Sequence, residues 1–506
     1  MTATGTHTPD ASIGDVGKAL GTDYFLIRPE LSDTEREYLD RARRFVEDEV
    51  LPVIGDYWER AELPLELIRR LGELGLVGDG IEFPGVPQMS PIAAGLVNME
   101  LNRGDGSIGT ALGVQAGLAM RSIAMLGSEE QKREWLPAMA RMEKLGAFAL
   151  TEPEHGSDSV ALETSARRDG DDYVISGRKR WIGFGSVADV VVVWARDTED
   201  GNVKGFLVET PAAGYNAAVI EGKGSLRAIW QAAIELDDVR VPASGMLPGG
   251  RSFRDTARVL RATRQTCAWA ALGHAVAAYD AALTYARERC QFGKPLVSFQ
   301  MVQERLVKML AEVTAMQLYC LRIGRLMESD QLSDTIAALA KLNNTVKARG
   351  VIAEARNLLG GNGLLLEYHA IRQWPTSRRS TPTRAPRRSR RCLSGATSPA
   401  SARSHSYRRP RASSARLRPV LAIPTGNPSA WVSGSAAASG PVRGRPGAIG
   451  SQRSSHSESS SNDSTGRSNA YARPAPETTF SSASGIRAAS MRALASGAIA
   501  SSSPCR

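Results

Sequence analysis

The run FALTEPEHGSD, residues 148–158, lies where the chain changes from helical to β-type patterning. Before it, apolar residues recur at helical spacing, for example between Leu39 and Val50. After it come the short runs YVISG, VVVVWA and GFLVE, separated by turn signals such as Asp169-Gly170-Asp171. A Gly-Ser pair inside the run allows backbone N–H groups to approach phosphate oxygens. We therefore expect a binding segment at the start of a β domain.

Helical patterning flanks the β part on both sides. Ser32 with Glu35 predicts a capping box at a helix start, Pro52 ends that run, and Ser128 begins a later helix. Further helical patterns follow the β part and stop at Gly360-Gly361. The order predicts an α+β fold, with an N-terminal all-α domain, a middle antiparallel β domain (a small barrel or sandwich) and a C-terminal α-helical bundle. The expected boundaries are 1–24 for a disordered N-terminus, 25–146, 147–245 and 246–372 for the three domains, the last truncated, and 373–506 for a disordered tail.

Length and composition limit the class of protein. The 506 residues are 42% hydrophobic and 23% charged, which suits two or three packed domains. No run of eighteen apolar residues occurs, so we expect no membrane-spanning helix. The N-terminus is polar and lacks the features of a secretory signal. Five cysteines without a CxxC spacing favour a reduced, cytoplasmic setting over a disulfide framework, and no metal site is expected.

The last 134 residues have a composition of their own. Residues 373–506 hold 21 Arg, no Lys and three acids, a charge of +18, so the first 372 residues carry −8 of the net +10. With 31 Ser and few apolar runs, this segment cannot bury enough surface to offset chain entropy. An Arg-rich tail is a candidate for binding RNA or anionic lipid. The absence of Lys and of interleaved aromatic residues argues against a nucleic-acid partner and fits a GC-rich gene translated in the wrong frame.

Three further motifs accompany the run at 148–158. They are KRWIG at residues 179–183, RCQFGKPL at 289–296 with Gln300 beyond it, and LGGNG at 359–363. In this order and spacing, the four motifs resemble the acyl-CoA dehydrogenase family over roughly residues 25–372. The segments at 115–131 and around 354–372 are most similar to its glutaryl-CoA dehydrogenase branch.

The resemblance implies FAD, bound non-covalently between the β domain and the C-terminal helices of a homodimer or homotetramer. It also implies an acyl-CoA substrate and an electron-transfer flavoprotein as acceptor. Thr151 would bond the isoalloxazine edge, Trp181 would cover one flavin face, and Arg289 and Gln300 would grip the pyrophosphate from a neighbouring subunit. The residues expected to bind the cofactor are Phe148, Leu150, Thr151, Gly156, Ser157, Trp181, Ile182, Gly183, Arg289, Phe292, Gln300, Leu358, Leu359, Gly360 and Gly361, and those expected to bind substrate are Ser157 and Arg264.

Each of these residues also has a simpler interpretation. A lone Trp such as Trp181 is more often core packing, and a lone Arg such as Arg289 is usually a solvated helix residue. The motif context favours the functional interpretation of Thr151, Ser157, Trp181 and Arg289. It does nothing for His155 and His369, which we expect to have no chemical role.

The catalytic base of the family is missing from its place. The reaction requires a carboxylate that removes the α proton while a β hydride passes to the flavin. In this branch that carboxylate is the Glu of a Tyr-Glu-Gly-Thr motif, about fifteen residues beyond the position of His369, which is Arg384 here. No Glu occurs between Glu367 and Glu458.

A shifted reading frame offers an explanation. The shifted frame takes the third base of each codon from Gln373 onward together with the first two bases of the next codon. Codons read in this way can encode the peptide Met-Ala-Asp-Leu-Glu-Ala-Ile-Tyr-Thr-Tyr-Glu-Gly-Thr. The Glu codon then spans Thr383 and Arg384. We therefore expect an FAD-dependent acyl-CoA dehydrogenase by descent, forming a trans-2-enoyl-CoA, whose activity in this chain is impaired. The rivals are a non-catalytic remnant that binds flavin or acyl-CoA, and a nucleic-acid-binding protein acting through its Arg-rich tail.

The resemblance also bears on the substrate. In glutaryl-specific enzymes an Arg of the first helical domain pairs with the distal carboxylate of the substrate. The matching position here is Gly109, followed by Thr110. A glycine supplies no charge, so we expect a small or medium monocarboxylic acyl-CoA rather than a dicarboxylic one.

Overall fold

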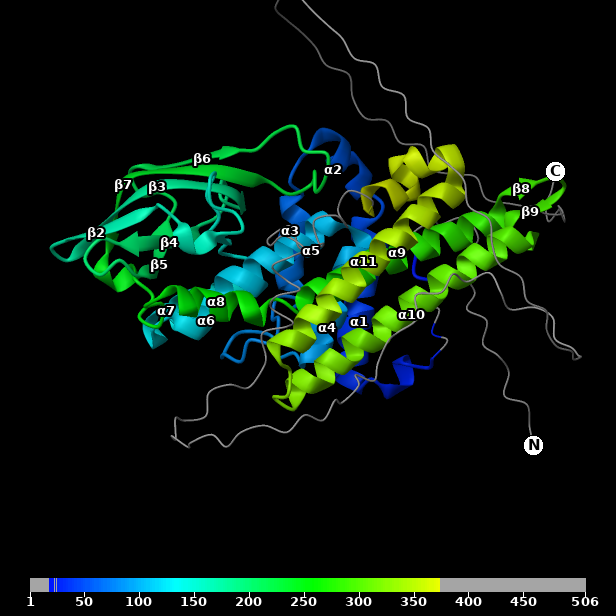
Figure 1. Ribbon diagram of the computed structural model, residues 1–506, viewed down its shortest axis with the longest axis horizontal. Helices are drawn as coiled ribbons and strands as arrows, with labels where there is room; N and C mark the ends of the chain where they lie inside the picture. The colour runs from blue at the N-terminus through cyan, green and yellow to red at the C-terminus, as the bar shows by residue number, and fades with distance from the viewer. Residues whose placement is uncertain (1–17, 22, 24, 374–506) are drawn as a thin grey trace, which may run out of the picture. The chain divides into compact units, whose positions relative to one another are not determined.

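The computed structural model describes residues 18–21, 23 and 25–373 (Figure 1). The expectations for 1–17 and for 374–506, including the disordered tail and the missing base at Arg384, lie outside the described residues. The helical and β regions follow one another in the predicted order: helices, a sheet, then helices again. Within the described residues, no helix combines the length and the apolar character that a membrane crossing needs.

The first helical region begins at the predicted capping box. The Ser32 Oγ accepts the Glu35 N–H at 3.3 Å, and the Glu35 carboxylate accepts the Ser32 N–H at 2.8 Å. A second capping box joins Ser128 and Gln131. The helices are α1 (Asp33–Arg44), α2 (Ile54–Arg60), α3 (Leu65–Glu73), α4 (Pro91–Gly104), α5 (Gly106–Val114), α6 (Arg121–Leu126) and α7 (Glu129–Ala140), with single π-helical segments at Phe45–Val50 and Gln115–Met120.

A seven-stranded sheet follows. Its strands are β1 (Gly146–Ala149), β2 (Ser165–Asp169), β3 (Asp172–Gly183), β4 (Val190–Asp197), β5 (Val203–Glu209), β6 (Tyr215–Val219) and β7 (Gln231–Pro242). Most neighbouring strands are antiparallel, as predicted, but β1 and β2 both pair with β4 in parallel. This arises because β1 and β2 lie one after the other along the same edge of β4, so the chain between them leaves the sheet and returns to it.

The third region holds α8 (Phe253–Ala262), α9 (Thr266–Glu288), α10 (Gln300–Glu328) and α11 (Asp334–Leu359). A small hairpin of β8 (Cys290–Gln291) and β9 (Lys294–Pro295) connects α9 to α10, and short 3₁₀ turns follow α11 at Gly360–Leu364 and Leu366–Tyr368. In Figure 1 this hairpin projects at the end of α9 and α10 that is remote from the seven-stranded sheet.

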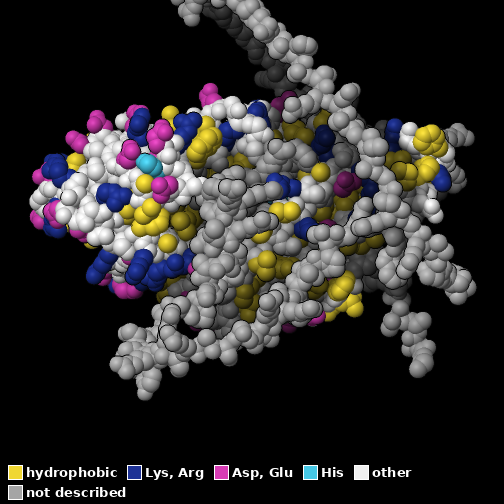
Figure 2. Space-filling model, in the orientation of Figure 1, with side chains coloured by type: hydrophobic (Ala, Val, Ile, Leu, Met, Phe, Trp, Pro, Cys, Tyr) yellow, Lys and Arg dark blue, Asp and Glu magenta, His cyan; other side chains and the backbone are white. Residues whose placement is uncertain are grey.

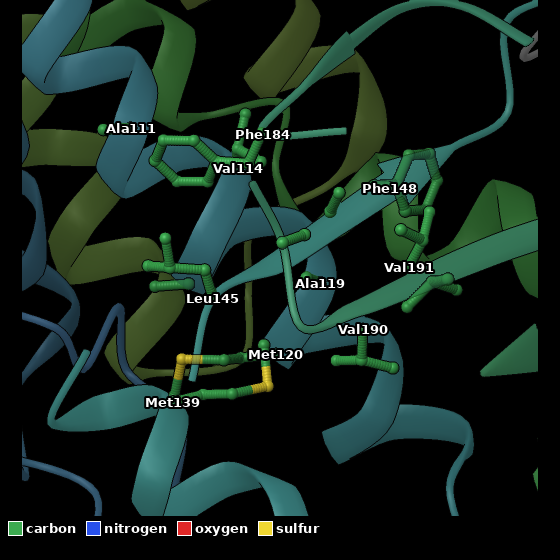
Figure 3. Close-up of a cluster of buried hydrophobic side chains, with 14 of the residues drawn as sticks. Ala111, Val114, Ala119, Met120, Met139, Leu145, Phe148, Phe184, Val190 and Val191 are labelled. Carbon is green, nitrogen blue, oxygen red and sulfur yellow. The ribbon is translucent and has the colours of Figure 1, made fainter. Parts of the chain in front are cut away.

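Two hydrophobic cores hold these regions together, and α4 belongs to both. One joins the first helices to the sheet, and Figure 3 shows part of it, with Val114 close to Phe184 and Met139 close to Met120. The other packs α1 and α4 against α9, α10 and α11. Nearly every residue of α4 is buried, as expected of a helix that is surrounded on all sides.

Candidate functional site

The segment between β1 and β2 forms the first part of the site. Gly146–Ala149 pairs with one half of β4, and Ser165 and Ala166 pair with its end. The intervening chain therefore forms a loop at the sheet edge, with Thr151 half-buried at the end of β1 and Gly156 and Ser157 exposed. Within the described residues, the N–H groups of Gly156 and Ser157 donate to no protein acceptor. They are available to an anionic ligand such as a phosphate.

Glu152 fixes both ends of this loop. Its carboxylate accepts the backbone N–H groups of Glu163 and Thr164 at 2.7 and 2.9 Å, and the Thr164 hydroxyl at 2.6 Å. The Lys179 Nζ of β3 donates to the same carboxylate at 2.9 Å and to the Trp194 carbonyl at 2.7 Å. The Glu152 and Lys179 side chains are 4% and 0% exposed, so this is a buried ion pair.

The two charges of the pair titrate unusually. Burial raises the pKa of Glu152, but the Lys179 ammonium and the donors from Glu163 and Thr164 outweigh it and lower that pKa to about 2. Burial also lowers the pKa of Lys179 to about 8, against the opposing effect of Glu152. Both groups therefore stay charged at neutral pH.

Trp181 is turned outward beside this loop. The pairing of β3 with β7 is irregular between Lys179 and Ile182, and Trp181 there has a φ of +66°. The Trp181 side chain is 51% exposed, and the Arg180 guanidinium lies 5.3 Å from its ring centre. The Arg180 N–H donates to the Thr151 carbonyl at 2.9 Å, which joins the two motifs. A large aromatic residue held exposed in a left-handed conformation is a feature that proteins retain at functional sites.

The neighbours of these residues face the core instead. Phe148 is buried against Trp194, with ring centres 5.9 Å apart, and Leu150 is also buried. Ile182 is buried, and a Cβ on Gly183 would lie 2.8 Å from a Val114 methyl of α5. The side chains of Phe148, Leu150 and Ile182 therefore pack into the core and support the loop and β3. Gly183 allows β3 to pack closely against α5.

The second group of predicted residues lies on the β8–β9 hairpin. Phe292 and Gly293 form its turn, with φ of +53° and +76°, as a two-residue hairpin requires. Phe292 is 91% exposed, and Arg289 and Gln300 are exposed as well. The hairpin projects away from the sheet in Figure 1, so one chain does not bring Arg289 to Thr151 and Trp181.

The glycine-rich turn lies close to Arg289. Leu358 and Leu359 are buried, whereas Gly360 ends α11 with a φ of +62° and is exposed together with Gly361. The following Asn362 donates its side-chain N–H to the Tyr285 hydroxyl at 3.2 Å. Tyr285 lies one helical turn before Arg289 on α9, so these two motifs share the same end of the helical bundle.

Arg264 is half-buried in the connection between α8 and α9. The sequence interpretation assigned no role to Glu152 or Lys179, although both stand inside its motifs. The sequence of β3 could have indicated the pair. Tyr173, Ile175 and Lys179 alternate along the strand on the side that faces the core, and a buried lysine requires a partner of opposite charge.

The donors and surfaces of the two groups fit a flavin dinucleotide. Thr151 offers a hydroxyl, the Gly156-Ser157 backbone offers N–H groups, and Trp181 offers a planar apolar face. The exposed Arg289 and Gln300 of the hairpin are suited to an anionic phosphate chain.

Comparisons with known proteins identify the family of the chain. Three domain models of acyl-CoA dehydrogenase match the chain: the N-terminal domain over residues 32–143, the middle domain over 147–239 and the C-terminal domain over 250–383. The chain is 33% identical to the mitochondrial short-chain specific acyl-CoA dehydrogenase of Bos taurus over 355 residues, which cover 69% of this chain and 86% of that protein.

Solved structures show the same similarity. A glutaryl-CoA dehydrogenase from Mycobacterium smegmatis is 39% identical with a TM-score of 0.70, covering 73% of this chain and 95% of that one. A structure from the same organism, in complex with FADH2, is 35% identical with a TM-score of 0.71, covering 73% and 96%. A structure titled as an electron transferring flavoprotein of Acidaminococcus fermentans is 28% identical with a TM-score of 0.69, covering 74% and 98%.

Proposed function

Since the chain belongs to the acyl-CoA dehydrogenase family, we propose that it is built for the FAD-dependent α,β-dehydrogenation of an acyl-CoA thioester to the trans-2-enoyl-CoA. The family consists of oxidoreductases, and the related structure with FADH2 supports FAD as the cofactor. The observation that carries the proposal is the hydrogen bond from the Arg180 N–H to the Thr151 carbonyl, which joins Thr151 to the strand of the exposed Trp181, beside a loop whose Gly156 and Ser157 N–H groups have no acceptor among the described residues.

Different residues of the chain would bind different parts of the cofactor and the substrate. FAD, when bound, supplies the acceptor for the β hydride of the substrate. The Thr151 hydroxyl and the Gly156-Ser157 backbone hold and orient the cofactor, and Trp181 covers one side of it and excludes water. Arg264 would bind near the CoA thioester, and Ser157 would contact both the substrate and the cofactor. The boundaries that we propose for the three domains are 25–146, 147–245 and 246–372.

The hairpin supports an oligomer. The β8–β9 hairpin lies away from the seven-stranded sheet in one chain (Figure 1), so Arg289, Phe292 and Gln300, on and beside this hairpin, serve the cofactor of a neighbouring subunit in a homodimer or homotetramer. Exposed apolar residues also occur on α10 and α11, at Met301, Val307, Leu339 and Leu342. Figure 2 shows hydrophobic side chains at the surface over the helices and at the hairpin end. We further propose a cytoplasmic location and an electron-transfer flavoprotein as acceptor.

The chain lacks the group that removes the α proton. Arg384 stands at the position of the base, and a guanidinium accepts no proton at any accessible pH. Loss of a general base costs on the order of 10²–10⁴ in rate. The chain is therefore an impaired member of its family, and its second candidate function is that of a non-catalytic protein that binds flavin or acyl-CoA. Nucleic-acid binding through the tail has no support beyond its charge.

Anaerobic flavin bleaching tests the proposal. The 506-residue protein is loaded with FAD and mixed with butyryl-CoA and related thioesters, and the flavin absorbance is followed. We expect FAD to bind and the absorbance to persist. Substantial bleaching would show that the chain retains a base, and failure to bind FAD would contradict the cofactor assignment.

A further inference from the structure

Burial of the Glu152–Lys179 pair within the sheet costs free energy. Two charges taken out of water lose hydration, and replacing a buried pair with well-packed apolar residues is often neutral or stabilising. Lys179 is nevertheless fully buried, and its ammonium reaches both the Glu152 carboxylate and the Trp194 carbonyl. A role in local geometry explains the pair better than a role in overall stability.

The pair stands next to both segments of the proposed flavin site. Glu152 directly follows Thr151, and Lys179 precedes Trp181 by two residues. Between them, the Arg180 N–H bonds to the Thr151 carbonyl at 2.9 Å. The ion pair and this hydrogen bond therefore fix the end of β1 against the bulge of β3 that turns Trp181 outward.

The same carboxylate closes the loop that carries Gly156 and Ser157. It accepts the N–H groups of Glu163 and Thr164 where the loop returns to the sheet. Thr164 then lies directly over β3, since a Cβ at Gly177 would be 2.6 Å from the Thr164 hydroxyl oxygen. One charged group thus determines where the loop begins, where it ends and how it meets β3.

We propose that Glu152 and Lys179 are positioning residues for the flavin site, which set the Thr151 loop and the outward-turned Trp181 in the one arrangement that accepts the cofactor. This inference rests on the proposed function. Without the Lys179 ammonium, a buried carboxylate remains with neutral donors only, and the loop relaxes toward solvent to hydrate it. Loss of the carboxylate instead frees both ends of the loop.

A double-mutant cycle with a matched control tests the proposal. The variants are Lys179→Met, Glu152→Gln and their combination, which removes both charges and leaves no unpaired carboxylate. The control is Lys204→Met, which breaks the pair between Lys204 of β5 and the buried Asp197 of β4 in the same sheet, without touching the Glu152 carboxylate or its partners. Three quantities are measured: the dissociation constant for FAD, the thermal midpoint, and iodide quenching of the Trp181 emission, obtained by subtraction of a Trp181→Phe variant.

We expect Lys179→Met to raise the FAD dissociation constant about tenfold or more and to change Trp181 quenching, with partial recovery in the double variant. Lys204→Met should lower the thermal midpoint while leaving both ligand-site measurements unchanged. If Lys179→Met and Lys204→Met alter FAD affinity equally, or if Lys179→Met leaves it unchanged, the positioning role is wrong. Should Lys179→Met fail to fold, the uncharged double variant decides by the same measurements.

The quenching measurement separates this inference from the proposed function. If the unaltered chain binds no FAD, the cofactor assignment fails, but Trp181 quenching still reports on the positioning role in the ligand-free protein. Unchanged Trp181 quenching in Lys179→Met, with unaltered FAD affinity, would overturn the inference while leaving the family function intact.

Discussion

The Glu152 carboxylate shows how one residue links the chemistry of the site to the pH dependence of the fold. Its pKa is lowered to about 2, so the folded chain keeps it ionised at pH values where the unfolded chain protonates it. Because folding lowers the pKa of Glu152 from 4.5, its ionisation stabilises the fold fully only above pH 4.5. This stabilisation is lost as the pH falls toward 2. Lys179, with a pKa of about 8, stays protonated throughout that window.

We expect this group to contribute a loss of about 3 kcal/mol in the free energy of unfolding as the pH falls from 4.5 to 2. Urea unfolding of the parent and of Glu152→Gln across this range checks the prediction. Other carboxylates titrate in both proteins, so the difference between the two curves isolates Glu152. Curves that stay parallel over the whole range would show that its ionisation does not support the fold.

Gly109 bears on whether the protein prefers dicarboxylic or monocarboxylic acyl-CoA substrates. It lies in α5, where a Cβ would be 2.2 Å from the Asn102 side-chain nitrogen of α4, so this position carries no charge and leaves no room for a long side chain. We expect glutaryl-CoA to bind no more tightly than butyryl-CoA in competition experiments. Binding of glutaryl-CoA about tenfold tighter than that of butyryl-CoA would contradict the prediction.

At the scale of elements, the β8–β9 hairpin and its flanks present the exposed Arg289, which we propose to serve the cofactor of a neighbouring subunit. We expect Arg289→Ala to raise the dissociation constant for FAD by about tenfold to a hundredfold, since a charge-assisted hydrogen bond to phosphate is lost. Arg287→Ala, which removes an exposed Arg two residues earlier on α9, should leave FAD affinity unchanged. Equal FAD affinity in the two variants, measured by flavin fluorescence, would remove Arg289 from the cofactor site.

Elements that depend on local chemistry were predictable from the sequence. The helix starts at Ser32 and Ser128 are confirmed, because a capping box is complete within four residues. The parallel pairing of β1 and β2 with β4 was not predicted, since strand order depends on contacts far apart in the sequence. The sequence motifs identified Thr151 and Trp181 as candidates, but the ion pair that joins their segments becomes visible only when β1 and β3 lie side by side.

For the molecule as a whole, the end of the described chain is firmly anchored. Arg372 and Gln373 are buried, and Arg372 pairs with the Asp105 carboxylate at 3.3 Å, the same residue that caps α5. The Gln373 Oε1 accepts the His274 Nδ1–H at 2.6 Å, and the Gln373 Nε2 donates to the Arg103 carbonyl at 3.3 Å. The sequence is thus integral to the fold up to the residue where the reading frame is expected to change.

This anchor makes a frame correction near codon 373 the decisive change for catalysis. The polar contacts of Arg372 and Gln373 hold the last described residues of the chain on the helical bundle. A shift of one base is expected to place a Glu at position 384, giving the site a proton acceptor, and to end the chain near position 405. Turnover should then rise by on the order of 10²–10⁴. The control carries the corrected frame with Gln in place of that Glu, so it shares the restored segment but has no base. Dye-linked oxidation of butyryl-CoA measures all three proteins, and equal rates in the corrected protein and its Gln control would show that this carboxylate is not the missing base.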